Sequence, residues 1–398
     1  MKFNKVVLKN GLTVLHEKRD VPVTTVMLAT RFGSVYESEK EKGIAHFIEH
    51  LCFKGTKKRT TNQIASELEK VGGNLNAFTS EEETAYHVKL PSRYLELAMD
   101  VISDIFFNPV FPEEEIKKEA NVICEEIKMY KDNPRGHVMT EIKACLYKDA
   151  FGMSIAGIEK NVLSMNREQL LNKHQEFYCP ANSILCVVGN NYFEDVVKLA
   201  EKYCVSQNIN TKKHVLEKIE FQNIKKTEKR ESLQQASIII GMHFPKMNDG
   251  DRYASEVFAA ILGEGMSSKL FTEVREKRGL AYAVKTELDM GKEYSYIIIY
   301  IGTDKEKTKP VIDLCIQEFK KMSEISEKEL MQGKEQIIGN SDVESESSDS
   351  TTLNLILEEI ADKAENHYKY EENINKVNLD DIKRLAKVSD FSYFILTP

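Results

Sequence analysis

One short apolar segment of the chain contains two histidines and a glutamate at helical spacing. His46, Glu49 and His50 lie at positions i, i+3 and i+4 of the segment GIAHFIEHLCFKGT, which spans Gly43–Thr56. On an α-helix, residues at this spacing direct their side chains to one face, about one turn apart. The remaining positions nearby are mostly apolar. The segment therefore predicts a buried helix with one polar face in a dry site.

These three residue types suit metal-assisted hydrolysis. Two imidazoles at this spacing can bind one zinc ion, and the carboxylate between them lies beside the ion's free positions. The order H-x-x-E-H is the signature of inverted zincins. We therefore predict His46 and His50 as zinc ligands and Glu49 as the base that takes a proton from a water molecule at the metal. A hydrogen-bonded polar cluster in an apolar core is the alternative that this segment alone leaves open.

A site with two histidines needs a third protein ligand, and the best source is the helical stretch Glu113–Met129, which contains no Gly or Pro. Glu119 and Glu126 are two helical turns apart and share a face, whereas Glu125 points about 100° away. We predict Glu126 as the third ligand and Glu119 as a carboxylate that orients a ligand or the Glu126 helix. A solvated acidic helix is the alternative, and it is the commoner fate of such a run.

With these residues in place, the chain resembles the pitrilysin/insulinase family of zinc peptidases. It is most similar to the branch of mitochondrial processing peptidase and its bacterial relatives of about 400 residues. In that branch the third ligand is a Glu 76 positions after the second His, and another essential Glu precedes it by seven; Glu126 and Glu119 stand at these positions. The resemblance covers nearly the whole chain. It implies a zinc metalloendopeptidase that holds one Zn²⁺ per chain.

The resemblance also implies roles for residues outside the metal segment. In the family, one strand lines the cleft and pairs with the substrate as an added β-strand, which gives affinity with little sequence preference. The matching residues here are Asn76, Ala77, Phe78 and Thr79. Arg275 and Tyr282 match an Arg and a Tyr that reach the substrate carbonyl, where they can stabilise the oxyanion that hydrolysis develops. Without the resemblance, the strand is an ordinary edge strand and Arg275 is one of many surface cations.

The length of 398 residues exceeds the usual size of one core, which favours two domains. The second half repeats the order of elements of the first, with a core strand at 236–243 and a helix at 251–262. Apolar side chains fill the face of that helix which carries ligands in the first half. The predicted organisation is a catalytic zinc-binding domain at 1–205, an interdomain linker at 206–230 and a duplicated domain without metal at 231–398.

The predicted fold class is α+β, with a mostly antiparallel sheet in each domain and helices packed on one face. The resemblance implies that the domains close like a clamshell around a chamber. The Ser-, Asp- and Glu-rich stretch 341–352 is predicted as a polar helix facing that chamber. An enclosed site would admit short or unfolded peptides, including leader or targeting segments, and exclude folded proteins.

Partners and location follow from composition and from the family. A net charge of −8 argues against nucleic acid, and no apolar run approaches the about 18 residues of a membrane span. Seven scattered cysteines and an N-terminus without targeting features favour a cytoplasmic protein. The family implies a homodimer or a heterodimer with a related chain. Three alternatives are weighed: a subunit of a heteromeric processing peptidase that needs its partner, a non-catalytic peptide-binding partner, and a metal-dependent hydrolase that acts on something other than peptides. The hairpin at 74–90 and the pair Arg275 and Tyr282 disfavour the last, since both suit an extended polypeptide.

Overall fold

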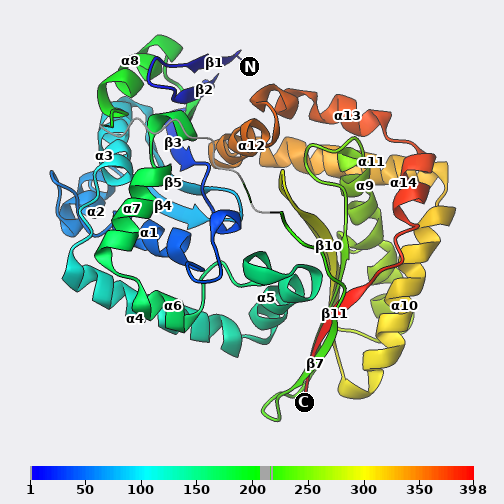
Figure 1. Ribbon diagram of the computed structural model, residues 1–398. Helices are drawn as coiled ribbons and strands as arrows, with labels where there is room; N and C mark the ends of the chain where they lie inside the picture. The colour runs from blue at the N-terminus through cyan, green and yellow to red at the C-terminus, as the bar shows by residue number, and fades with distance from the viewer. Residues whose placement is uncertain (1, 207–215, 217) are drawn as a thin grey trace. The chain divides into compact units, whose positions relative to one another are not determined.

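The computed structural model describes residues 2–206, 216 and 218–398 and contains two sheets (Figure 1). The first sheet has the strands β1 (Lys2–Val7), β2 (Thr13–Lys18), β3 (Val23–Thr30), β4 (Asn74–Thr79), β5 (Thr84–Pro91) and β6 (Ser183–Gly189). The second has β7 (Lys225–Lys229), β8 (Ala236–His243), β9 (Ala283–Met290), β10 (Ser295–Thr303) and β11 (Ser392–Thr397).

The α-helices are, in chain order, α1 (Ile44–Cys52), α2 (Thr61–Glu69), α3 (Leu95–Phe107), α4 (Glu113–Asp132), α5 (Pro134–Leu146), α6 (Glu159–Ser164), α7 (Arg167–Phe177), α8 (Phe193–Tyr203), α9 (Arg252–Gly263), α10 (Thr308–Lys321), α11 (Glu327–Glu344), α12 (Ser348–Ala361), α13 (Tyr370–Lys376) and α14 (Leu379–Leu385). The predicted α+β class, with one mostly antiparallel sheet in each of two related halves, is confirmed.

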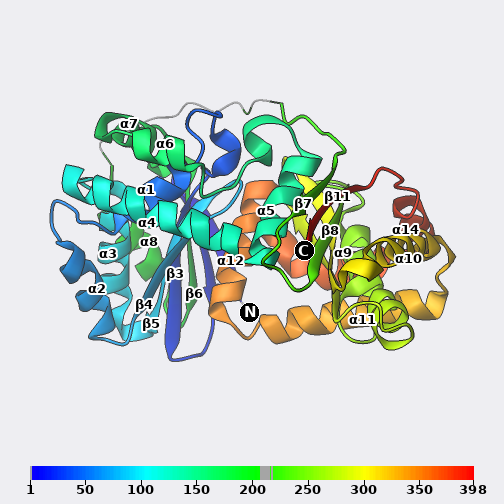
Figure 2. The ribbon, with the colours of Figure 1, turned by 90° about the horizontal axis from the view of Figure 1, so that it is seen from below.

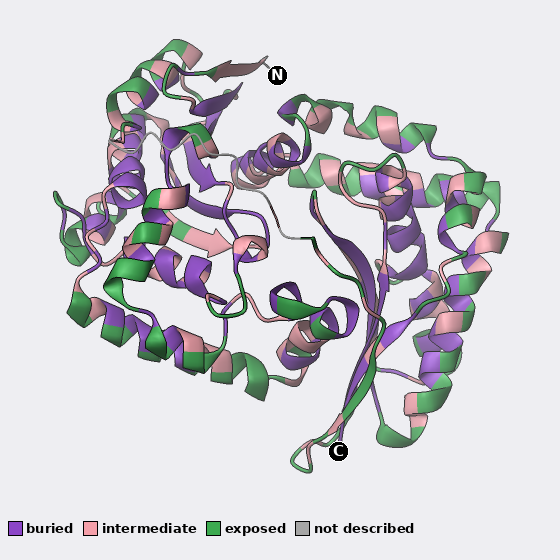
Figure 3. Ribbon diagram, in the orientation of Figure 1, coloured by how far each residue is buried: buried purple, intermediate pink, exposed green. Residues whose placement is uncertain are grey.

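The first sheet has the strand order β1-β2-β6-β3-β5-β4 and is antiparallel except for the pair β2 and β6. Alternate residues of β3 enter two different apolar cores. Val26 and Leu28 pack in the core that contains residues of α1, α3 and α4, while Met27 and Ala29 pack with residues of α12. Both faces of β3 are therefore covered, and all of its residues after Val23 are buried (Figure 3).

The second sheet has the order β7-β11-β8-β10-β9, and only β11 and β7 run parallel. Ile238 and Ile240 of β8 lie in a core with residues of α9, α10 and α14. On the opposite face, α5 contacts β8 and β11. Gly241 permits this contact, since a Cβ atom there would lie 2.9 Å from side-chain carbons of both Ile142 and Leu146.

The prediction placed helices on one face of each sheet. The structure has helices on both faces, because α12 covers the second face of the first sheet and α5 that of the second sheet. The chain forms two compact units: Met1–Lys128, Ser154–Glu217 and Glu344–His367 in the first, and Met129–Met153, Lys218–Val343 and Tyr368–Pro398 in the second. A single division at 206–230 would place α5 with the first sheet and α12 with the second. In the structure α12 lies on β3 and β6 of the first unit (Figure 2).

Two predicted segments differ in detail from the structure. Within the predicted linker 206–230, residues 207–215 and 217 lie outside the described residues, while Lys225–Lys229 forms strand β7. The stretch 341–352 is divided between the end of α11 and the start of α12. Thr351 and Thr352 are buried in α12, so this part is not a wholly solvated polar helix.

Among the described residues, no helix is both long enough and apolar enough to cross a membrane.

Candidate metal centre

Helix α1 begins directly after its N-cap residue Gly43, whose φ of 100° lies in the left-handed region that favours glycine. The carboxylate of Glu37 accepts hydrogen bonds from the backbone N–H groups of Gly43 (3.1 Å) and Ala45 (2.8 Å). A negative charge at a helix N-terminus also interacts favourably with the helix dipole. The Nζ of Lys42 lies 3.3 Å from Glu37 Oε2, and both side chains are fully buried. These contacts fix where α1 starts, and therefore which way its side chains point.

His46, His50 and Glu126 come together where α1 and α4 meet, with one potential ligand atom from each residue within 4.8 Å of the others. The Nε2 atoms of both histidines lie 3.7 Å from Glu126 Oε2. This separation is too long for a hydrogen bond. Ligand atoms about 2.0–2.1 Å from one tetrahedral zinc ion lie about 3.3–3.4 Å from one another. The two distances to Glu126 are within a few tenths of an ångström of that spacing, and the whole group lies within 4.8 Å, so the three residues fit a shared ion.

Glu119 contacts His50 at Nδ1, whereas Glu126 lies near Nε2 of the same ring. The Oε2 of Glu119 lies 3.1 Å from Nδ1 of His50, while Lys54 Nζ lies 2.8 Å from its Oε1. A neutral imidazole that offers Nε2 to an ion carries its proton on Nδ1 and can donate it to such a carboxylate. His46 differs, because its buried Nδ1 has no hydrogen-bond partner among the described residues.

Burial and charge act differently on the two ligand histidines. Burial, reinforced by the neighbouring imidazole of His50, lowers the pKa of His46 to about 4, so this ligand is neutral at neutral pH. Burial lowers the pKa of His50, but its hydrogen bond to Glu119 and the nearby carboxylates outweigh this effect and raise the pKa, so a metal must displace a proton there. Burial raises the pKa of Glu119, but its hydrogen bonds to His50 and Lys54 outweigh this effect and hold the pKa below its ordinary value.

Glu49 leaves the same helix but is not part of the ligand cluster. The hydroxyl of Thr79 donates a 2.6 Å hydrogen bond to its Oε2. Burial raises the pKa of Glu49 above its ordinary value, and this effect outweighs the opposing hydrogen bond from Thr79. A carboxylate with a raised pKa, held by one oxygen, is suited to accept and return a proton with the other.

Thr79 ends β4, which is an edge strand of the first sheet and pairs, among the described strands, with β5 alone. The strand also contacts α1. Its side chains are exposed or half-buried, and the N–H of Ala77 binds the side-chain Oδ1 of its own neighbour Asn76 at 2.9 Å. An edge strand with exposed main-chain groups can accept a further strand. The predicted strand Asn76–Thr79 is thus brought beside Glu49.

Arg275 and Tyr282 belong to the second unit. Arg275 lies in a π-helix, η5 (Phe271–Glu276), with its guanidinium 4.7 Å from the centre of the Phe271 ring. Tyr282 is 50% exposed, and its ring lies over Gly302. A Cβ atom on Gly302 would lie 2.3 Å from the Tyr282 Cζ and 2.5 Å from its hydroxyl oxygen. Only glycine therefore leaves room for the ring in this position.

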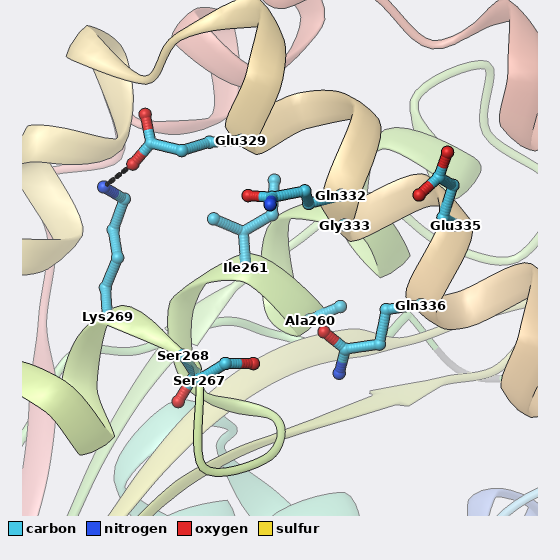
Figure 4. A pocket seen from close by; sticks show the side chains of 10 residues that line it. All are labelled: Ala260, Ile261, Ser267, Ser268, Lys269, Glu329, Gln332, Gly333, Glu335 and Gln336. Carbon is cyan, nitrogen blue, oxygen red and sulfur yellow. Dashed lines mark hydrogen bonds and ion pairs between the residues drawn. The ribbon is translucent and has the colours of Figure 1, made fainter.

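A cavity of about 530 Å³ lies in the second unit, between α9, α11 and residues 267–269 (Figure 4). Lys269 and Glu329 form an ion pair of 2.5 Å across it. Ala260 and Ile261 line it from α9, the helix that corresponds in order to α1, and neither residue type binds metal. Among the described residues, His46, His50 and Glu126 form the one group of three or more metal-type ligands.

Comparisons with known proteins identify the family. Residues 12–157 match the family described as insulinase (peptidase family M16), and residues 164–337 match the peptidase M16 inactive domain. An uncharacterized zinc protease of Bacillus subtilis is 34% identical over 402 residues, covering 99% of this chain and 96% of its own. Another, of Rickettsia felis, is 36% identical over 342 residues, covering 85% of this chain and 82% of its own. The chain belongs to the insulinase family, peptidase family M16, and the predicted membership is confirmed.

Solved structures share the fold over the full length. A protease from Helicobacter pylori matches with a TM-score of 0.89 and 23% identity, covering 100% of this chain and 99% of its own. A structure described as a peptidase M16 inactive domain, from Pseudomonas fluorescens, matches with a TM-score of 0.92 and 18% identity, covering 100% and 98%. Similarity at these identities establishes the two-domain fold.

Proposed function

We propose that the protein is a zinc-dependent metalloendopeptidase that hydrolyses short or unfolded peptides. The observation that carries this proposal is the convergence of His46, His50 and Glu126, with Glu49 beside them on α1. The names of the relatives as zinc proteases support the choice of metal and of reaction. His and carboxylate ligands also accept other divalent ions, so metal identity is part of the test.

In this proposal the two histidines and Glu126 would hold one zinc ion, through Nε2 of each imidazole and a carboxylate oxygen. When bound, zinc would supply Lewis-acid chemistry for hydrolysis of the scissile bond. Glu49 accepts the proton of the attacking water and then delivers it to the leaving amine. Thr79 holds one oxygen of Glu49, which leaves the other free for this transfer.

The outer edge of β4 suits an extended peptide as the substrate. We propose that the substrate pairs with Asn76–Thr79 and that main-chain hydrogen bonds provide most of the affinity. Such pairing selects an extended backbone more than a particular sequence, which fits cleavage of leader or targeting segments. Arg275 and Tyr282 complete the proposed site by stabilising the oxyanion of the tetrahedral intermediate.

The proposed function is tested with the purified chain and a pool of unstructured peptides, read by mass spectrometry. Cleavage should disappear after treatment with a chelator and return with one equivalent of zinc per chain. Glu126→Gln should weaken zinc binding by more than the about 10–100-fold that loss of an orienting partner costs. Glu125→Gln is the matched control, because this neighbour is 74% exposed and pairs with Lys128.

A chain that binds zinc but cuts nothing would contradict a single-chain peptidase. The second candidate, a subunit that needs a related partner chain, would then be tested by adding the partner captured from the native source. Restored cleavage on addition would establish that role. A non-catalytic peptide-binding role would instead require peptide binding without cleavage in the presence of both chains.

The role proposed for Tyr282 can be tested by replacing the tyrosine itself and by replacing Gly302, the residue that its ring lies over. Tyr282→Phe should lower kcat by about 10²–10³-fold, the usual cost of one oxyanion donor. Gly302→Ala should produce a loss in the same direction, because the added methyl group displaces the Tyr282 ring. The control is Gly339→Ala, where a Cβ atom meets nothing within 4 Å. Full activity of Gly302→Ala would show that Tyr282 does not act from its position over Gly302 of β10.

A further inference from the structure

Lys54 follows helix α1 directly and contacts Glu119, which contacts the metal ligand His50. The Nζ of Lys54 lies 2.8 Å from Oε1 of Glu119, and the other oxygen of the same carboxylate lies 3.1 Å from His50 Nδ1. Each carboxylate oxygen thus has one partner of its own. The Glu119 side chain is 8% exposed, and those of Lys54 and His50 are 24% and 21% exposed.

We propose that Lys54 positions His50 through Glu119, and so sets how tightly the metal is bound. This inference rests on the proposed function, which makes His50 a ligand. A carboxylate that accepts from the second nitrogen of a ligating histidine fixes both the tautomer and the orientation of the ring. The carboxylate can do so only if it does not rotate. A cation held on its other oxygen restricts that rotation.

The backbone geometry supports this role. The N–H of Lys54 donates to the carbonyl of Leu51 at 3.0 Å, and the N–H of Phe53 donates to that of His50. Lys54 is therefore attached to the last turn of the helix that carries the ligand. The imidazole and the cation are thus held close together at the end of α1, and both bind the one carboxylate that α4 supplies.

Charge supports the same assignment. Three carboxylates, those of Glu49, Glu119 and Glu126, lie at or beside the ligand cluster, and Lys54 places a positive charge 2.8 Å from one of them. That carboxylate, Glu119, is not itself a proposed ligand. Lys54 supplies this charge without occupying a position at the metal, because its ammonium lies on the Oε1 side of Glu119.

Lys54 also lines a hollow of about 680 Å³ with Lys57, Lys58 and the first turn of α4. Lys57 is exposed, and no ion pair involving it is present among the described residues. It stands three positions further on the same loop and has the same side chain. Lys57→Met is therefore a matched control for Lys54→Met, in which the ammonium is replaced by an apolar group of similar length.

The test measures zinc affinity of the full chain by competition with a chromophoric chelator. Lys54→Met should weaken zinc binding by about 10-fold. Lys54→Arg should restore most of the affinity, and Lys57→Met should leave it unchanged. Lys54→Met combined with Glu119→Gln should bind no more weakly than Glu119→Gln alone, because both act through one contact. A Co²⁺-loaded sample should show a shifted visible spectrum in Lys54→Met, since the ligand ring is reoriented.

Several outcomes would overturn the inference. Unchanged affinity in Lys54→Met beside weakened affinity in Glu119→Gln would show that Glu119 needs no second partner. Equal losses in Lys54→Met and Lys57→Met would indicate a general charge effect. Circular dichroism of the metal-free variants separates these results from misfolding. If the wild-type chain binds no zinc, the proposed function itself fails, whereas an unchanged Lys54→Met in a zinc-binding chain removes this inference alone.

Discussion

Replacing Glu49 with glutamine is expected to lower peptide cleavage by about 10²–10⁴-fold while zinc remains bound. Glutamine keeps the shape of the side chain and can still contact the Thr79 hydroxyl, but it cannot accept the proton of the attacking water. Because Glu49 is outside the ligand cluster, zinc stoichiometry should not change. Cleavage rate and zinc content are measured on the same preparation, so that loss of metal and loss of the base are separated.

The control for this substitution is Glu69→Gln, since Glu69 is an exposed residue at the end of α2. It should cleave at the wild-type rate. Retention of near wild-type cleavage by Glu49→Gln would contradict its assignment as the base. Loss of zinc together with activity would instead place Glu49 among the groups that hold the metal.

Lys42→Met is expected to destabilise the first unit by about 3–5 kcal/mol, the cost of leaving one partner of a buried ion pair uncompensated. Lys42 and Glu37 are fully buried, and Glu37 also binds two backbone N–H groups at the start of α1. Loss of the ammonium leaves the buried Glu37 carboxylate without its charge partner, with only the two backbone N–H groups to bind. The measurement is urea unfolding followed by far-UV circular dichroism, which suits a chain without tryptophan.

Lys40→Met serves as the control, because Lys40 is exposed two positions earlier. It should change the free energy of unfolding by no more than about 0.5 kcal/mol. If both variants unfold at the same urea concentration, the buried pair does not support α1. The double variant Lys42→Met, Glu37→Gln should recover part of the loss, since it removes the uncompensated charge but weakens the helix cap.

Much of the candidate site could be predicted because it depends on local spacing. Positions i, i+3 and i+4 of a helix share a face whatever the helix packs against. The side chains of His46, Glu49 and His50 could therefore be predicted to lie on one face of the helix. The seven-residue interval between Glu119 and Glu126 has the same property. Helices α1 and α4 have the bounds that these arguments need. That the two helices meet came from the family resemblance, because spacing within one helix says nothing of its neighbours.

Other features of the site gave no local signal. Glu37 and Lys42 lie in a charged run, ESEKEKG, that is typical of a solvated turn, yet both side chains are fully buried. Lys54 stands in a basic loop with Lys57 and Lys58, and the sequence does not distinguish it from these two. Among the described contacts, only Lys54 of the three pairs with Glu119. Burial of a charge depends on a partner that is distant in sequence or on the surrounding fold. The pattern of residue types along the chain indicates neither the distant partner nor the surrounding fold.

Sequence alone established the helix of the metal segment, the shared face of its three polar side chains and the duplicated order of elements. Helical and strand periodicity follow from backbone geometry, so they can be read before any tertiary contact exists. The tertiary structure decided which sheet α5 and α12 cover and that the polar segment Lys225–Lys229 is a strand. An apolar face predicts that a helix will be buried, but it does not identify the surface that the helix packs against. That surface is a sheet face left uncovered by other helices, and it exists only once the chain has folded.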